Sequence, residues 1–417
     1  MIRTRLGYTL LLYALLPRVL WHLLWRARRQ PAYLENIPER FGYYRQEVKA
    51  PLIWVHAVSV GETRAAAPLI LALREKYPRH QILLTHMTPT GSETGEALFG
   101  DGVLRCYLPY DYPGAVARFL DHFKPQVGLL METEIWSNLI HGCCRRGIPL
   151  YLVNARMSEK SLARYHRFSD LVRASLRELT AVAAQTRDDA ERLAALGAEN
   201  VTVAGNLKFD IEPPAAQLEL GERWRRSYGK SRPVLLAAST RDGEEEELLG
   251  VLEQIAVPSL LTVIVPRHPQ RFDEVAALLE RRGVRFQRRS GNAVIAPETR
   301  VLLGDSMGEM FAYYAACDIA FVGGSLLPFG GQNLIEACAV ARPTLVGPHT
   351  YNFAEATDLA IAAGATVRVG DARELAREAK RLLDDRNAAA RMAEAARTFS
   401  KAHQGATART LELIRFG

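Results

Sequence analysis

The chain has few cysteines and no motif in which they bind metal or cycle between thiol and disulfide. Its five cysteines are Cys106, Cys143, Cys144, Cys317 and Cys338. Their odd number, the adjacent pair and the lack of C-x-x-C spacing argue against a disulfide framework or a zinc site and favour a reducing compartment. The ten histidines form no H-x-x-x-H or H-E-x-x-H pair. We therefore expect no metal centre and no resident cofactor.

Two common nucleotide-binding signatures are also missing. The sequence has no lysine-containing phosphate loop of the G-x-x-x-x-G-K-[ST] type, and no G-x-G-x-x-G opens its first β-α turn. These patterns carry the phosphate contacts of ATPases and dinucleotide enzymes. Both classes therefore lose support.

Most of the chain lacks an excess of charge of either sign. The net charge is +7, but residues 1–49 hold nine Lys/Arg against three Glu, so the remaining residues carry only about +1. Because the basic character belongs to the N-terminus, the sequence gives little support to nucleic-acid binding.

The N-terminus carries the longest apolar stretch, LGYTLLLYALLPRVLWHLLW at residues 6–25. Its uninterrupted part ends at Arg18 after about a dozen residues, fewer than the roughly 20 that a spanning helix needs. Trp21 and Trp25 beside Arg26 suit a membrane interface, and the arginines suit anionic lipids. We predict that residues 1–30 form a membrane-anchor helix at the cytoplasmic face of a membrane. Whether it spans or lies flat stays open, as does an alternative in which it packs on protein.

After residue 50, short apolar runs alternate with amphipathic helical stretches, which predicts parallel sheets covered by helices. Runs such as LIWVHAVSV (52–60) and PVLLAAST (233–240) read as strands. The Pro pair and dense charge of residues 210–233 interrupt the rhythm and read as a linker. We therefore predict an α/β protein with two Rossmann-like, doubly wound domains facing a cleft. Its predicted parts are residues 31–212, a linker at 213–230 and residues 231–417.

The second half contains a candidate phosphate site. Gly330 and Gly331 precede a helical start, whose exposed N–H groups suit an anion, and Glu336 lies where acidic residues bind ribose hydroxyls. Arg267 and His268 follow a strand and could hold the phosphate from the other side.

In the first half, carboxylates follow strands. Glu62 is either a helix N-terminal acid stabilised by the helix dipole or a catalytic group; a helix beginning near Thr63 would favour its ionised form. Glu132 and Glu134 either cap a helix and pair with an arginine (Arg145 or Arg146) or act in chemistry. Lys208 reads as a solvated loop lysine when taken alone.

A set of motifs, in this order along the chain, resembles the Kdo transferase family of lipopolysaccharide synthesis, Kdo being 3-deoxy-D-manno-octulosonic acid. The motifs are SVGE (59–62), TEIW (133–136), NARMS (154–158), GNLKFD (205–210), PRHP (266–269), GGSLLPFGGQNLIE (323–336) and GPHTYNF (347–353). The resemblance implies a GT-B glycosyltransferase, inverting and metal-independent. It would transfer Kdo from CMP-Kdo to the lipid A precursor (lipid IVA).

The resemblance also assigns roles to matching residues. It makes Glu62 the general base, while Glu132 and Lys208 stabilise the transition state. The residues it implies for contact with CMP are Arg267, His268, Met307, Gly308, Glu309, Asn333 and Glu336. The chain departs from the family pattern at Arg241 and Gln332, where histidine is usual, and at Ala337, where proline is usual.

Three alternatives remain beside this hypothesis. The first is another GT-B enzyme, such as a UDP-sugar transferase or epimerase. The second is a membrane-recruited nucleotide-binding module without catalysis, in which the carboxylates only cap helices. The third, a dinucleotide oxidoreductase, should bind NAD(P). The number of Kdo residues added, the acyl pattern of the acceptor and the oligomeric state cannot be predicted from the sequence.

Overall fold

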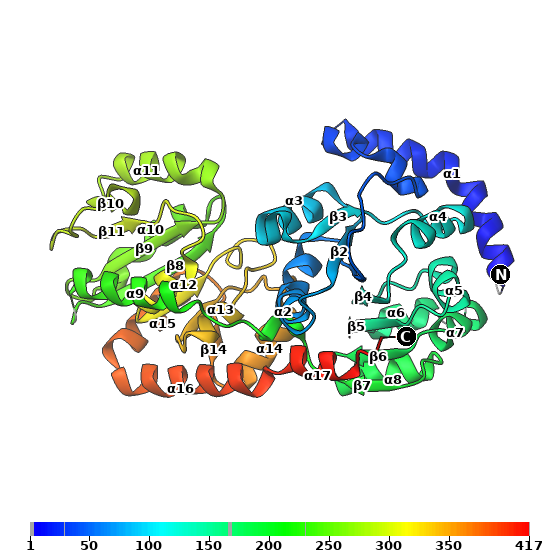
Figure 1. The fold of residues 1–417 in the computed structure, drawn as a ribbon. Coiled ribbons are helices and arrows are strands. Elements are labelled where there is room, and N and C mark those ends of the chain that lie inside the picture. Colours follow the sequence, from blue (N-terminus) through cyan, green and yellow to red (C-terminus); the bar gives the residue numbers. More distant parts are fainter. Residues whose placement is uncertain (1–3, 29, 166–168, 230, 417) are drawn as a thin grey trace. The chain divides into compact units, whose positions relative to one another are not determined.

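The computed structural model describes residues 4–28, 30–165, 169–229 and 231–416, and the chain divides into two compact α/β units (Figure 1). The first unit contains residues 1–210 and 403–417, and the second contains residues 211–402. Arg3 and Arg29, which flank the N-terminal apolar stretch in the sequence, lie outside the described residues.

The first unit is built on a seven-stranded parallel sheet in the order β3-β2-β1-β4-β5-β6-β7. Its strands are β1 (Leu52–His56), β2 (Gln81–His86), β3 (Leu104–Tyr107), β4 (Val127–Met131), β5 (Leu150–Ala155), β6 (Ala181–Ala184) and β7 (Val201–Val203). The central strands are buried on both sides, as expected for a parallel sheet covered by helices. Alternate residues feed two cores: Trp54 packs on one face of β1, and Ile53 and Val55 pack on the other.

Helices cover both faces of this sheet. The helices of the unit are α1 (Arg5–Ala27), α2 (Val60–Lys76), α3 (Pro89–Phe99), α4 (Pro113–Phe123), α5 (Ser137–Arg145), α6 (Glu159–Tyr165), α7 (Ser169–Arg177), α8 (Arg187–Ala195) and α17 (Ala406–Leu413). Short 3₁₀ turns are η1 (Pro31–Leu34), η2 (Ile37–Phe41), η3 (Gly100–Gly102) and η5 (Leu207–Phe209).

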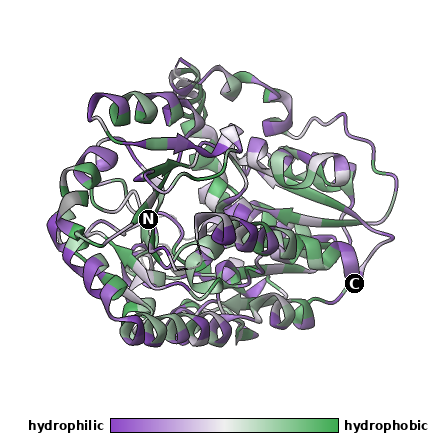
Figure 2. Ribbon diagram, turned by 90° about the vertical axis from the view of Figure 1, so that its left-hand side faces the viewer, coloured by the Kyte–Doolittle hydropathy of each residue, from purple (hydrophilic) through white to green (hydrophobic). Residues whose placement is uncertain are grey.

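The second unit has the same architecture, with the strand order β10-β11-β9-β8-β12-β13-β14. Its strands are β8 (Val234–Thr240), β9 (Leu261–Pro266), β10 (Phe286–Arg288), β11 (Val301–Leu303), β12 (Ile319–Val322), β13 (Thr344–Val346) and β14 (Thr366–Arg368). Its helices are α9 (Ala215–Tyr228), α10 (Glu244–Ile255), α11 (Phe272–Arg281), α12 (Met310–Ala316), α13 (Ile335–Ala339), α14 (Ala354–Ala362), α15 (Ala372–Asp384) and α16 (Arg386–His403). The turns are η6 (Pro269–Arg271) and η7 (Arg289–Gly291). Figure 2 shows the resulting pattern, in which the strands are largely hydrophobic and many helices carry polar residues on one face.

The structure differs from the predicted domain limits in two places. The segment predicted as a linker forms α9, which packs on α12 within the second unit, because Trp224 and Tyr228 bury themselves against its core. The C-terminal tail does not end in the second unit: α17 packs on α2 and β6 of the first. Asp210 fixes this return by accepting hydrogen bonds from the amides of Gly405 (2.7 Å), Ala406 (3.3 Å) and Thr407 at the start of α17.

The N-terminal helix α1 lies against the first unit. Thr9 donates a hydrogen bond to Asn138 (3.1 Å), the Tyr112 hydroxyl donates to the Leu12 carbonyl (3.1 Å), and Leu23 and Ala27 are buried. By length and composition α1 could cross a membrane, although Arg18 interrupts its apolar residues. Most of its large apolar side chains are exposed, among them Leu10 (61%), Trp21 (66%) and Leu24 (56%).

Candidate active site

The candidate catalytic residues of the first unit meet at the point where the strand order reverses. The chain winds outward from β1 through β2 to β3 and then returns to place β4 on the other side of β1. Glu62 follows β1 and Glu132 follows β4. In open parallel sheets, ligands bind beyond the carboxyl ends of strands at such a reversal. The sequence prediction that Glu62 lies at a ligand-binding edge therefore has a structural basis.

Glu62 occupies the first turn of α2. The predicted strand over residues 52–60 is too long, because β1 ends at His56 and Ser59 is already the N-cap of α2. The Glu62 carboxylate accepts a hydrogen bond from the Val58 amide (2.9 Å) and one from the Ser59 hydroxyl (3.1 Å). This is a variant of the capping box, in which the acid reaches back beyond the N-cap.

The environment of Glu62 opposes its ionisation. The pKa of Glu62 is raised to about 7, chiefly by burial and also by the negative charges of Glu132 and Glu134, while the Val58 amide and the Ser59 hydroxyl act against this rise. The predicted preference of the helix start for the ionised form does not decide the net pKa, because desolvation outweighs the contributions that lower it. A carboxylate with a pKa near 7 is suited to accept a proton at neutral pH.

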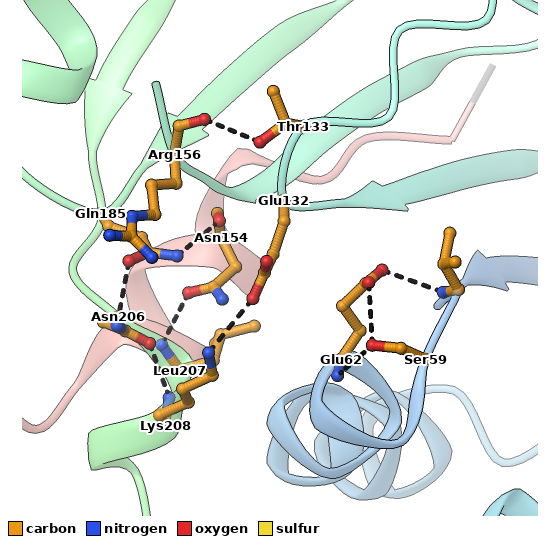
Figure 3. Close-up of polar contacts among 11 residues, drawn as sticks. Ser59, Glu62, Glu132, Thr133, Asn154, Arg156, Gln185, Asn206, Leu207 and Lys208 are labelled. Atoms are coloured by element: carbon orange, nitrogen blue, oxygen red, sulfur yellow. Dashed lines mark hydrogen bonds and ion pairs between the residues drawn. The ribbon is translucent and has the colours of Figure 1, made fainter. Parts of the chain in front are cut away.

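Glu132 and Lys208 form an ion pair across from Glu62 (Figure 3), with Lys208 Nζ 3.2 Å from Glu132 Oε1. Both side chains are partly buried. Glu132 has a left-handed backbone (φ 57°), a strained conformation for a residue with a long side chain and one found often at functional sites. The proposed pairing of Glu132 with Arg145 or Arg146 is wrong. The prediction of a solvated loop lysine is also wrong, because Lys208 has this partner.

A chain of hydrogen bonds among strand-end loops holds Lys208 in position (Figure 3). Asn206 caps η5 by accepting from the Lys208 amide (3.0 Å) and donates to Gln185 (2.9 Å). Gln185 in turn donates to the Asn154 carbonyl (2.9 Å), and the Asn154 side chain accepts from the Leu207 amide (2.9 Å). The end of β5 and the loops after β6 and β7 are thus joined. Gln185, which ends the apolar run AVAAQ, has a role that the sequence did not reveal.

In the second unit, several cations gather at the carboxyl edge of the sheet. Arg267 follows β9, and its Nε donates to the Gln332 side chain (3.3 Å). His268 is exposed, and its pKa is lowered by partial burial and then by the positive charges of Arg241, Arg267 and Arg271. A histidine destabilised in its charged form by three arginines marks a region of positive potential, which favours an anion.

The loop from Gly330 to Asn333 lies beside these cations. Gly330 and Gly331 both have positive φ (92° and 78°), and Gly331 donates to the Gly324 carbonyl, while the Asn352 amide donates to the Gly330 carbonyl. A Cβ on Gly330 would lie 2.3 Å from the Asn352 side chain, so only glycine fits. The glycines precede α13 by several residues, because the helix begins at Ile335.

Asn333 and Glu336, both predicted to contact CMP, are brought together. The Asn333 amide donates to Glu336 Oε1 (3.1 Å), and its oxygen accepts from the Ile335 amide (3.1 Å). Glu336 lies in the first turn of α13, and its carboxylate is partly exposed at this edge.

Met307, Gly308 and Glu309 follow β11, the neighbour of β9. Met307 is 56% exposed, and Gly308 is also exposed with a positive φ of 76°. Glu309 forms an ion pair with Arg289 (3.2 Å). These three residues thus share the edge of the sheet with Arg267, although Glu309 is engaged in a local contact.

The run EEEE (244–247) contains structural residues that the sequence concealed. Four acidic residues in a row predict a favourable first helical turn, and α10 does begin at Glu244. Glu244 and Glu245 are nevertheless fully buried. The Glu244 carboxylate accepts from the amides of Arg241 (2.8 Å), Gly324 (2.6 Å), Ser325 (2.9 Å) and Leu326 (2.9 Å). Glu245 binds Thr240 and Arg271.

Two parallel sheets of this topology, with candidate catalytic groups on one unit and a cationic loop cluster on the other, form the architecture of the two-domain glycosyltransferases. Residues 282–399 match the model of glycosyl transferases group 1. The fold is also that of the UDP-GlcNAc 2-epimerase from Neisseria meningitidis, with a TM-score of 0.58 and 17% identity over 87% of this chain and 99% of that one.

Residues 35–211 match the model described as 3-deoxy-D-manno-octulosonic-acid transferase. The 3-deoxy-D-manno-octulosonic acid transferase of Bordetella pertussis is 48% identical over 98% of this chain and 98% of its own. That of Haemophilus influenzae is 37% identical over 99% and 98%. The chain belongs to the 3-deoxy-D-manno-octulosonic acid transferase family.

Proposed function

We propose that the protein transfers Kdo from CMP-Kdo to the lipid A precursor at the cytoplasmic face of the inner membrane, with inversion and without a metal ion. The observation that carries this proposal is the Glu62 carboxylate, whose pKa is about 7 and which lies at the sheet reversal across from the Glu132–Lys208 pair. Family membership supports the choice of sugar.

Glu62 acts as the general base. A hydroxyl of the acceptor attacks the anomeric carbon of Kdo while its proton passes to the Glu62 carboxylate, and the bond from that carbon to the CMP phosphate breaks. The leaving phosphate departs as an anion and needs no proton, so one carboxylate is enough for inversion. An enzyme that retained configuration through a covalent intermediate would need a second carboxylate as nucleophile. A positioned base of matched pKa contributes roughly 10²- to 10⁴-fold to the rate.

Lys208 and Glu132 stabilise the developing charges. As the bond to CMP breaks, the sugar becomes electron-poor and the phosphate gains charge. The Lys208 ammonium and the Glu132 carboxylate are held at 3.2 Å, so they offer fixed charges of both signs without reorganisation.

The donor nucleotide binds to the second unit. The positive region of Arg241, Arg267 and Arg271 supports the phosphate of CMP, and Glu336 accepts hydrogen bonds from ribose hydroxyls. Because arginines supply the positive charge, we expect chelators such as EDTA to leave the rate unchanged.

The experiment that tests the proposal combines the purified protein, CMP-Kdo and a tetra-acylated lipid A precursor, with the product mass read by mass spectrometry. We expect the acceptor to gain the mass of one or more Kdo residues, and the number gained gives the count. UDP-sugars in place of CMP-Kdo should give no product. Transfer from a UDP-sugar, or no transfer from CMP-Kdo, would overturn the proposal.

A further inference from the structure

A cavity of about 880 Å³ lies between α1 and the body of the first unit. We call it the α1 groove. One wall is the C-terminal half of α1, including Leu15, Val19 and Trp21, and the opposite wall includes Met87 and Tyr110. The groove therefore offers apolar surface beside a helix whose outer side is itself apolar and exposed.

Three arginines give the α1 groove a positive charge. Arg18 and Arg26 line it from α1, and both are exposed. Arg40 lines it from η2 and is only 1% exposed. The apolar groove thus holds a set of cations, which is the combination expected for a ligand with both an apolar and an anionic part.

Arg40 is an unusual buried cation, because part of its guanidinium has no hydrogen-bond partner, although Glu39 and Tyr110 interact with its charge. Its Nη1 donates to the Met87 carbonyl (3.2 Å), and its guanidinium lies 4.1 Å from the centre of the Tyr107 ring. Its Nε and Nη2 have no hydrogen-bond partner among the residues that the structure describes. The adjacent carboxylate of Glu39 is instead bound by Gln46 (2.7 Å) and by the Tyr107 amide (2.8 Å). A buried polar group without partners is costly, and an anionic ligand would relieve that cost.

The α1 groove reaches the immediate neighbour of the candidate base. Val58 and Thr88 line the groove, and the Thr88 hydroxyl donates to the Val58 carbonyl (3.1 Å). The amide of the same Val58 donates to the Glu62 carboxylate (2.9 Å). A molecule in the groove would therefore be separated from Glu62 by a single residue, Val58.

We propose that the α1 groove binds the acceptor through a phosphate group on the acceptor's sugar headgroup. The phosphate contacts Arg18 and Arg26, and the positive charge of the buried Arg40 attracts it. The apolar wall of α1 receives the adjoining part of an acyl chain. Specificity for a phosphorylated amphiphile is thus built into the first unit, and binding there brings an acceptor hydroxyl toward Glu62. This inference rests on the proposed function for its choice of acceptor.

Binding can be measured through the change in tryptophan fluorescence when lipid is added, because Trp21 lines the groove. The probes are the tetra-acylated lipid A precursor and the same lipid after phosphatase treatment, both in neutral detergent micelles so that bulk lipid charge is absent. We expect the wild-type protein to bind the phosphorylated form roughly tenfold more tightly or better, because phosphate–arginine contacts are strong charge-assisted hydrogen bonds.

Two double variants separate the groove from general charge. Arg18→Ala with Arg26→Ala should lose most of the preference, whereas Arg5→Ala with Arg28→Ala, which removes the same charge from the two ends of α1 outside the groove, should keep it. Arg40→Gln should also lose the preference and Arg40→Lys should retain it, with thermal unfolding used to verify that each is folded. Equal binding of both lipids by the wild type, or an equal loss in both double variants, would overturn the proposal.

Kdo transfer measured in the same samples tests the proposed function separately. A wild-type protein that prefers the phosphorylated lipid but transfers no Kdo supports the groove and overturns the proposed function. One that transfers Kdo equally well to both lipids, with no difference in KM, supports the proposed function and overturns the groove.

Discussion

Burial and neighbouring negative charge both raise the pKa of Glu62, and each makes the residue a stronger base at neutral pH. Desolvation penalises the carboxylate, Glu132 and Glu134 repel it, and two hydrogen bonds from Val58 and Ser59 keep it in place. An acceptor hydroxyl could replace the Ser59 hydroxyl as a donor to the same carboxylate. The capping role and the catalytic role are therefore compatible in one residue.

The pH dependence of kcat/KM should report this pKa. The base must be deprotonated to act, so kcat/KM should rise about tenfold per unit below pH 7 and level off above it. Glu134→Gln removes one repelling charge, which should shift this limb to lower pH. Replacement of the exposed Glu75 by Gln, on the same helix α2 as Glu62, should not shift it. A limb centred near pH 4.5 in the wild type would contradict the assignment.

For single residues, the sequence indicated which residues belong to the candidate site, but it did not indicate which side chains they contact. Glu62 was predictable because SVGE follows an apolar run and joins a helix. The pairing of Lys208 with Glu132 was not predictable from residue properties, because 76 positions separate them and only the sheet order brings them together. The family resemblance named both residues, but not the ion pair.

Among the elements, α10 is joined to the loop after β12 by the buried carboxylate of Glu244. Glu244 accepts hydrogen bonds from four amides, three of them consecutive in the loop after β12. That loop continues into Gly330, Gly331 and Asn333. The run EEEE (244–247) indicates a favourable first helical turn, but nothing local distinguishes its two buried members, Glu244 and Glu245, from the other two.

Glu244→Gln should weaken both the fold and donor binding. Because the amide can satisfy fewer of the four N–H donors, we expect the free energy of unfolding to fall by about 2 to 4 kcal/mol. KM for CMP-Kdo should rise more than KM for the acceptor. Glu246→Gln, on the exposed side of the same helix, is the control and should change neither. Denaturant unfolding and steady-state kinetics measure these effects, and equal behaviour of the two variants would contradict the role.

Over the whole molecule, two parallel sheets and the alternation of strands and helices followed from periodicity alone. The strands β3 and β10 escaped prediction because they are short and contain charged residues: LRCY and FQR. The return of α17 to the first unit was also not predicted, because Asp210 and residues 405–407 come into contact only in the folded chain. The tail's own pattern, rich in Ala, Arg and Glu, gives no hint of its partner.

The exposed apolar side of α1 should hold the protein at a membrane surface. Both halves of α1 contact the body of the first unit, so we infer that the helix lies in the plane of the interface. Replacing Leu6, Leu10 and Leu24 by serine should reduce co-sedimentation with anionic vesicles by about 100-fold or more, since each buried leucine contributes about 1.5 to 3 kcal/mol.

The control for membrane binding replaces exposed apolar residues elsewhere. Leu71→Ser with Leu98→Ser removes leucines of similar exposure from α2 and α3 and should leave sedimentation unchanged. Unimpaired binding of the α1 variant, or equal release of the control, would contradict membrane attachment through α1.

The most direct test of the account is the single-turnover rate of Kdo transfer by Glu62→Gln, measured with saturating CMP-Kdo and lipid A precursor. Glutamine keeps the size of the side chain but cannot accept a proton, so the rate should fall roughly 10²- to 10⁴-fold with little change in either binding constant. The same variant should be more stable than the wild type above pH 7. The folded-state pKa of Glu62 is raised, so the wild type loses stability, relative to the variant, as pH rises from about 4.5 to 7. Transfer by Glu62→Gln at the wild-type rate would refute the assignment of Glu62 as the base.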